Sequence, residues 1–92
     1  MAIEVRIPTI LRTYTAGAKQ VEGTGSTLDE LISDLEQRYS GLRGRLIDEG
    51  SLRRFVNVYL NDEDVRFLDG LQTKVKDGDT VTVLPAVAGG AG

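Results

Sequence analysis

One segment of this 92-residue chain, residues 27–39, has the pattern of an amphipathic helix, which is stable only where its apolar face is covered. Thr27 is followed three residues later by Glu30, a pairing typical of a capping box, in which both side chains satisfy N–H groups at the helix start. Apolar residues then recur at intervals that place them on one face: Leu28, Leu31, Ile32, Leu35 and Tyr39. The sequence therefore predicts a helix over residues 27–39 that packs against another element.

Alternating apolar residues elsewhere in the chain predict β-strands, which provide the surface that covers the helix. In the first such segment, Ile3, Val5 and Ile7 alternate with polar residues, the period-two pattern of a half-buried strand. The predicted strands are residues 2–8, 18–22, 54–60, 65–67 and 80–84. The predicted connections are an extended stretch at 11–14 leading to a turn at 16–17, one helical turn within 42–47, a loop at 48–51 and a tight turn at 77–79.

The order of these elements indicates how they pack. Strand, strand, helix, strand, short strand and strand provide one main helix and a mixed sheet to cover its apolar face. We therefore expect an α+β fold of the β-grasp type, with the helix laid across the sheet. Residues 1–85 form this domain, and residues 86–92, which are small and rich in glycine, form a flexible C-terminal tail.

The residue types that are missing exclude several kinds of chemistry. Without Cys there are no disulfides or thiolate nucleophiles, and without His there is no imidazole catalysis. Eleven Lys and Arg against fourteen Asp and Glu give a net charge of −3, which argues against nucleic-acid binding. No apolar run is long enough to cross a membrane, and Glu4 and Arg6 interrupt the first apolar stretch, unlike in a signal peptide. We expect a cytoplasmic domain that is not an enzyme and binds no metal, cofactor, membrane or nucleic acid.

The tail carries an unusual concentration of glycine, since three of the eleven glycines fall in the last four residues. Taken alone, this is compatible with a mobile chain end or an expression scar. A functional alternative is a substrate arm, because glycine has no Cβ and lets the backbone pass through a narrow channel into the active site of another enzyme. The tail residues that would serve in this way are Val87, Ala88, Gly89 and Gly90.

Several stretches together resemble a known family. They are residues 6–12 (Arg-Ile-Pro-Thr-Ile-Leu-Arg), 31–36, 54–67 (which include Asn-Asp-Glu-Asp-Val-Arg-Phe), 77–79 (Asp-Gly-Asp) and 84–90, which end in Gly-Gly. Over residues 1–90 the chain resembles the ubiquitin-like sulfur carrier proteins of the ThiS/MoaD family, in particular the carriers of cysteine biosynthesis, the CysO type. The resemblance implies a ubiquitin-like fold and a carrier rather than an enzyme.

The resemblance also implies that the reactive group is the backbone carboxylate of Gly90. An E1-like enzyme would use ATP and Mg²⁺ to adenylate this carboxylate, and a sulfur donor would then convert it to a thiocarboxylate. In the cysteine pathway the sulfur would attack an aminoacrylate on a pyridoxal-phosphate synthase, and a metallopeptidase would release the cysteine. ATP, Mg²⁺, zinc and pyridoxal phosphate would then be bound by these partners and not by this chain.

The last two residues depart from the family pattern. Such carriers are active with Gly-Gly at the very end, whereas Ala91 and Gly92 follow Gly90 here. One hypothesis is that the chain is a precursor, cut between Gly90 and Ala91 by a JAMM-type metallopeptidase. The alternative is that Gly92 itself is activated.

Partner contacts are predicted around the final strand. The resemblance places Leu84, with Pro85 beside it, at the interface with the E1-like enzyme. Because the valines of residues 54–60 take the helix side of their strand, the aromatic residues point to the opposite face, where they form an apolar docking patch or belong to the core. The aromatic residues on that face are Phe55 and Tyr59, whereas Phe67 is assigned to no face.

Two charged clusters remain. Asp62, Glu63 and Asp64 indicate a solvated turn rather than a metal site, because adjacent carboxylates do not converge as they do in a calcium-binding loop. The second cluster belongs either to a solvated loop or to a contact with a phosphate or an acidic partner. It consists of Arg43, Arg45, Arg53 and Arg54.

Three functions stay open on this basis. The first is a sulfur carrier, with cysteine synthesis favoured and thiamin, molybdopterin or natural-product sulfur as alternatives. The second is a ubiquitin-like modifier joined through Gly90 to lysines of other proteins. The third is a small interaction domain in which the tail has no role. Deleting Gly90 abolishes the first two functions and leaves the third.

Overall fold

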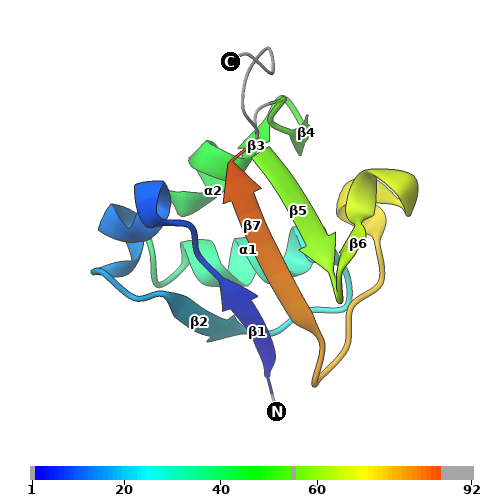
Figure 1. Cartoon of the computed structure of the whole chain (residues 1–92), viewed down its shortest axis with the longest axis horizontal. Coiled ribbons are helices and arrows are strands. Elements are labelled where there is room, and N and C mark those ends of the chain that lie inside the picture. The colour runs from blue at the N-terminus through cyan, green and yellow to red at the C-terminus, as the bar shows by residue number, and fades with distance from the viewer. Residues whose placement is uncertain (1, 55, 86–92) are drawn as a thin grey trace.

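The computed structural model of the chain describes residues 2–54 and 56–85. A five-stranded sheet has the order β2–β1–β7–β5–β6, and α1 (Leu28–Glu36) lies across one of its faces (Figure 1). The strands are β1 (Ile3–Arg6), β2 (Gln20–Gly23), β5 (Val56–Leu60), β6 (Glu63–Asp64) and β7 (Thr80–Pro85). Because β7 runs parallel to β1 and antiparallel to β5, the sheet is mixed. The predicted β-grasp architecture is confirmed.

Shorter elements connect these strands. After α1 comes α2 (Leu42–Leu46), which confirms the predicted helical turn. β3 (Ile47–Asp48) and β4 (Ser51–Leu52) then pair with each other as a separate ladder. The described 3₁₀ helices are η1 (Thr9–Thr15), η2 (Val65–Phe67) and η3 (Gly70–Gln72).

The start of α1 is fixed by the predicted cap. Thr27 Oγ1 accepts a hydrogen bond from Glu30 N at 3.2 Å, and Glu30 Oε1 accepts one from Ser26 N at 2.8 Å. The loop before the cap passes very close to the helix, since a Cβ on Gly25 would lie only 2.7 Å from Leu31 N. Only glycine fits at that position without displacing the backbone of α1.

The end of α1 comes three residues before the predicted end at residue 39, because the hydrogen bonding tightens after Glu36. Gln37 N donates to Asp34 O at 3.3 Å, which is a bond to the third residue back rather than the fourth. The Glu36 carboxylate accepts from Gly41 N at 2.9 Å and from Arg43 N at 2.8 Å, and these bonds lower the pKa of Glu36. Glu36 therefore closes α1 and also satisfies N–H groups at the start of α2.

The hydrophobic core lies between α1 and the sheet. Both layers contribute side chains that are at most 2% exposed: Val5, Val58 and Val81 from the strands, and Leu28, Leu31 and Leu35 from α1. Val21 also faces the core, as predicted for the second strand. Burial of these apolar side chains is the main favourable contribution to folding of a domain of this size.

Two sequence predictions about local structure are wrong. Residues 11–14 are not extended, because they belong to the 3₁₀ helix Thr9–Thr15, in which Leu11 is buried and its N–H donates to Pro8 O at 2.9 Å. Residues 48–51 are not a simple loop, because Asp48 pairs with Ser51 across a turn that Gly50 completes with a φ of +79°. In both places contacts between residues three apart in the sequence decide the conformation, and the apolar pattern does not report them.

A third wrong prediction concerns the strand expected at residues 65–67. Asn61 and Asp62 both have positive φ, so β5 reverses within two residues and its partner β6 begins already at Glu63. Asp64 then ends β6, because its Oδ1 accepts a hydrogen bond from Arg66 N at 2.8 Å and caps η2. Residues 65–67 therefore form a 3₁₀ turn, with Val65 in the core.

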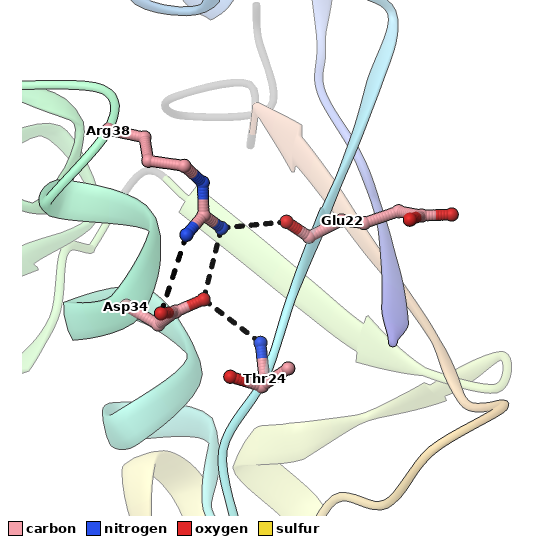
Figure 2. Close-up of polar contacts among 4 residues, drawn as sticks. All are labelled: Glu22, Thr24, Asp34 and Arg38. Carbon is pink, nitrogen blue, oxygen red and sulfur yellow. Dashed lines mark hydrogen bonds and ion pairs between the residues drawn. The ribbon is translucent and has the colours of Figure 1, made fainter. Parts of the chain in front are cut away.

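At the β2 edge of the sheet, two side chains of the segment that contains α1 bond to the backbone of β2 and of the residue that follows it. Figure 2 shows Arg38, whose Nη2 donates to Asp34 Oδ2 at 3.0 Å and to Glu22 O at 2.8 Å. Asp34 Oδ2 also accepts from Thr24 N at 3.0 Å. The hydrogen bond from Arg38, and after it the one from Thr24, lowers the pKa of Asp34. These contacts occupy backbone groups of an edge strand that would otherwise be open to another strand.

Acid is expected to weaken the fold through Asp34. Because the pKa of Asp34 is lower in the folded chain than in the unfolded one, its contribution is complete above about pH 4 and is lost as the pH falls through the folded-state value. Asp34→Asn is expected to lower the free energy of unfolding at pH 7 by about 1 kcal/mol or less, and to match the unsubstituted chain in strong acid. Urea unfolding over a pH series measures both. Asp69→Asn, which removes an exposed carboxylate elsewhere, is the control, and a difference that stays constant at every pH would contradict this role of Asp34.

Candidate functional site

The described part of the chain ends at the tip of a central strand. β7 lies between β1 and β5, and its last residue, Pro85, pairs with Val56 of β5 (Figure 1). Because β1 runs parallel to β7, the segment that follows β1, from Pro8 to Ile10, reaches the same end of the sheet. The surface around this strand end is therefore the described surface nearest in sequence to the tail.

Two grooves meet at this end of the sheet, with volumes of about 480 Å³ and about 530 Å³. The described residues that line both are Pro8, Ile10, Val83, Leu84 and Pro85, which we refer to as the tail-base surface. Ile10 is 65% exposed and Leu84 is 45% exposed, although both are large apolar side chains. Contiguous exposed apolar residues of this kind are typical of a docking surface.

Cations surround the tail-base surface. Those that line the two grooves are Arg45, Arg53 and Arg54 in one, and Arg6, Arg12 and Lys19 in the other. Among the described residues of the groove walls, Asp48 is the sole carboxylate. The chain as a whole has a net charge of −3, so this end is locally basic within an acidic protein. Such a surface is complementary to an acidic partner surface and accelerates the encounter with it.

Some of these arginines are fixed by nearby groups. Arg53 Nε donates to Gly44 O at 2.7 Å, and Arg12 Nε donates to Ile7 O at 3.1 Å. The guanidinium of Arg45 lies 5.9 Å from the centre of the Tyr14 ring, within the range of a cation–π contact. We refer to the cations that line the two grooves as the basic rim. Its side chains are therefore partly ordered before any partner binds.

The basic cluster predicted from the sequence is brought together only in part. Arg45, Arg53 and Arg54 line one groove, but Arg43 does not, because its Nη1 donates to Ser33 Oγ of α1 at 2.8 Å. The sequence could not separate Arg43 from Arg45, since the helical turn of α2 decides which of the two faces the groove.

The sheet face opposite α1 is less apolar than predicted. Leu84 pairs with Asn57 and Tyr59 pairs with Thr82, so Leu84 and Tyr59 are diagonal neighbours on that face. Tyr59 is only partly exposed. The neighbouring positions on the same face are polar: Glu4, Arg6, Asn57, Thr80 and Thr82. Tyr59 and Leu84 thus form a small apolar pair within a polar surface.

Phe67, which the sequence assigns to no face, does not join this pair. It lies in η2, beyond β6, and its side chain is 87% exposed. The 3₁₀ turn at residues 65–67, found in place of the predicted strand, removes Phe67 from the sheet. Phe55, the remaining aromatic residue of the predicted patch, lies outside the described residues.

The tail also lies outside the described residues. The reactive group predicted at Gly90, the arm of Val87, Ala88 and Gly89, and the processing site before Ala91 therefore stay predictions.

Neither a metal cluster nor a membrane helix is found in the part of the chain that the structure describes. Across residues 2–54 and 56–85, no three or more His, Cys, Asp or Glu side chains come together as ligands for an ion. Asp62 and Glu63 are exposed on the turn after β5. Among the same residues, no helix has the length and apolar character to cross a bilayer.

Sequence reasoning did not single out Ile10 as a contact residue. The signal that was available is an apolar residue placed just after Pro8, outside the alternating strand pattern. Its exposure becomes visible only once the 3₁₀ helix Thr9–Thr15 directs the side chain outward.

Comparison with known proteins identifies the family of this fold. The ThiS family model matches residues 5–90, which is nearly the whole chain. The chain belongs to the ThiS family. The match includes the tail-base surface and extends through Gly89 and Gly90.

Relatives within and around the ThiS family agree with this assignment. The sulfur carrier protein CysO of Mycobacterium tuberculosis is 59% identical over 93 residues, covering 98% of this chain and 100% of the relative. A chain in the crystal structure of the Amycolatopsis orientalis BexX/CysO complex is 60% identical, with a TM-score of 0.92 over 96% of this chain and 99% of that chain. Small archaeal modifier protein 3 of Haloferax volcanii is 46% identical over 65 residues, or 71% of each chain.

These relatives bear on the class of function. A ThiS-family chain with a close full-length likeness to a sulfur carrier is a ubiquitin-like carrier and not an enzyme, as predicted. The likeness to a protein solved in a complex also supports contact with partner proteins.

Proposed function

We propose that this chain is a sulfur carrier whose backbone carboxylate at Gly90 is the working group, and that it serves cysteine synthesis. The observation that carries the proposal is the likeness to CysO over nearly the full length of both chains. The ThiS match ends at Gly90, which supports that residue as the reactive terminus. Removal of Ala91 and Gly92 by a metallopeptidase then exposes the carboxylate.

The proposed chemistry takes place in two steps on partner enzymes. The Gly90 carboxylate attacks the α-phosphate of ATP on an E1-like enzyme, forming an acyl-adenylate and releasing pyrophosphate. A sulfur donor then displaces AMP and leaves a thiocarboxylate. This group stays ionised at neutral pH, so it is nucleophilic without a histidine, and the chain has none. ATP and Mg²⁺ are held by the activating enzyme.

The folded body supplies recognition in this scheme. The tail-base surface offers Leu84 and Ile10 as exposed apolar contacts, and the surrounding arginines steer an acidic enzyme surface toward the tail. Tyr59 lies beside Leu84 on the sheet and extends the contact area. The body therefore acts as the part that the partner binds, while the tail carries the reactive group.

The proposed acceptor is a pyridoxal-phosphate synthase that holds an aminoacrylate. The thiocarboxylate sulfur adds to the aminoacrylate, and an acyl shift leaves cysteine joined to Gly90 by an amide bond. A zinc metallopeptidase then releases cysteine and regenerates the carrier. Since these enzymes and their cofactors act on small metabolites, the proposed location is the cytoplasm.

The test is to incubate a chain ending at Gly90 with its E1-like enzyme, ATP and a sulfide donor, and to measure its intact mass. The expected product has one terminal oxygen replaced by sulfur and is consumed by a synthase that carries an aminoacrylate. Intact mass of the protein purified from its own host shows whether Ala91 and Gly92 are missing in the cell. A chain that accumulates only as an adenylate, or never loses these two residues, would count against the proposal.

A second candidate function is a protein modifier, supported by the likeness to small archaeal modifier protein 3. Activation is the same, but the acyl group passes to a lysine and forms an isopeptide. Conjugates that resist thiol treatment and map to Gly90 in a tryptic digest would favour this function. Within the carrier function, thiamin, molybdopterin and natural-product sulfur are the alternative acceptor pathways, and they are separated by which synthase consumes the thiocarboxylate.

A further inference from the structure

Arg66 is an exposed arginine whose side chain nevertheless makes three hydrogen bonds to one short stretch of the chain. Its Nη2 donates to Arg53 O at 2.9 Å and to Val56 O at 2.6 Å. Its Nη1 donates to Asn57 Oδ1 at 2.6 Å. The guanidinium therefore joins η2 to the first two residues of β5 and to the turn before them.

The backbone of Arg66 is itself held in place. Val65, immediately before it, is fully buried in the core, and Asp64 Oδ1 accepts a hydrogen bond from Arg66 N at 2.8 Å. Asp64 belongs to β6, which pairs with Tyr59 near the far end of β5. Because Asp64 is held in β6 and Val65 is held in the core, the backbone of Arg66 is fixed, and its side chain extends back along β5.

The stretch that Arg66 holds lies opposite the end of the last strand. Val56 pairs with Pro85, and Asn57 pairs with Leu84. Arg53 O, which accepts from Arg66, also accepts from Val56 N at 3.2 Å. The same turn carries Arg53 and Arg54, two cations of the basic rim. The Arg66 side chain thus joins the start of β5, which pairs with the end of β7, to the turn that carries Arg53 and Arg54.

We propose that Arg66 is a positioning residue: it fixes the end of the sheet at Pro85 and, through it, the place and direction from which the reactive tail enters an activating enzyme. This inference rests on the proposed function for its second half. When an enzyme binds the folded body of the carrier, the fraction of time that the tail spends in a reactive position depends on how well the position of Pro85, where the tail begins, is fixed. The effect is therefore expected in turnover rather than in binding.

Arginine suits this task better than lysine. The guanidinium is a planar fork, so two of its nitrogens reach acceptors on both sides at once. A lysine ammonium is a single point and cannot occupy both nitrogen positions. Arg66→Lys is therefore expected to behave like Arg66→Gln, in contrast to a site where only charge is needed.

Arg38 provides a matched control. It is also exposed, also bonds to a strand carbonyl, and also joins a helical segment to the sheet, but at β2, which β1 separates from β7 (Figure 2). Arg38→Gln removes a comparable set of hydrogen bonds far from Pro85. Arg38→Gln therefore measures how the loss of hydrogen bonds elsewhere in the fold affects the rate of adenylation.

The experiment compares Arg66→Gln, Arg66→Lys and Arg38→Gln in the chain that ends at Gly90, well below the melting temperature of each. The Arg66 variants are expected to lower kcat for adenylation about tenfold with KM within about twofold, and Arg38→Gln is expected to change neither by more than about twofold. Unchanged kcat in the Arg66 variants, or an equal loss in Arg38→Gln, overturns the proposal.

Hydrogen exchange gives a readout that does not depend on any enzyme. The amides of Asn57 and Leu84 are expected to exchange about tenfold faster in Arg66→Gln than in the unsubstituted chain or in Arg38→Gln. Equal exchange in all three chains also overturns the proposal. If the unsubstituted chain is not adenylated at all, the proposed function fails, while the exchange result still decides whether Arg66 fixes this end of the sheet.

Discussion

A chain that ends at Gly90 is expected to be adenylated, and the chain that ends at Gly92 is expected to react at least about a hundredfold more slowly with the same enzyme. In the longer chain the carbonyl of Gly90 is part of a peptide bond, which offers no carboxylate oxygen to attack ATP. The carboxylate of Gly92 lies two residues further from the tail-base surface, or about 7 Å in an extended chain. An enzyme that binds the body at Leu84 would therefore place the wrong atoms at the α-phosphate.

A series of chain ends separates length from sequence. Chains ending at Gly89, Gly90, Ala91 and Gly92 are assayed for pyrophosphate release with the E1-like enzyme, and a sharp maximum at Gly90 is expected. A chain ending at Gly90 with Gly90→Ala tests whether a Cβ at the reacting residue is tolerated at the same length. Comparable activity for the Gly92 end would mean that trimming is unnecessary and that Gly92 is the activated residue.

The architecture could be predicted from the sequence because its signals are local and repetitive. The capping box of Thr27 and Glu30 reports where α1 begins, and the apolar spacing of α1 and the alternation around Val81 and Val83 report which faces the structure buries. The order of strands around one helix then leaves few ways to cover it.

The errors have a different physical origin. At residues 65–67 the apolar spacing looks like a strand, but two positive φ angles at Asn61 and Asp62 shift the pairing, and the Asp64 cap ends it. A period-two pattern over three residues cannot report such a shift. The same displacement takes Phe67 out of the sheet that contains Tyr59.

The candidate site was predictable at its apolar centre and in part of its basic surroundings, since the sequence already groups Arg45, Arg53 and Arg54. Leu84 follows from its place at the end of the final strand and from the family resemblance. The grooves beside it depend on Ile10 and on arginines from four separate segments, which the fold brings together across long stretches of sequence. No spacing rule connects Arg12 with Arg54, so the complete set of cations around the two grooves emerges only from the tertiary structure.

Leu84→Thr is expected to raise KM for the E1-like enzyme roughly thirtyfold, which corresponds to about 2 kcal/mol of binding free energy. Leu84 is a 45% exposed residue of the tail-base surface, so a partner that covers it gains the burial of a large apolar side chain. Threonine keeps the preference for a β-strand, and the site lies at the end of β7. Stability is therefore expected to change little, while the apolar contact is lost.

Phe67→Thr is the matched control for this prediction. Phe67 is more exposed than Leu84, at 87%, and it does not line either groove. If any exposed apolar residue contributed to binding, Phe67→Thr would have the larger effect, because more apolar surface is available there for burial. We expect it to leave KM within about twofold, and steady-state adenylation measured for both variants at the same enzyme concentration provides the comparison. An effect of Phe67→Thr equal to that of Leu84→Thr would move the docking surface from the end of β7 to the η2 side of the sheet, because only a partner covering η2 responds to that substitution.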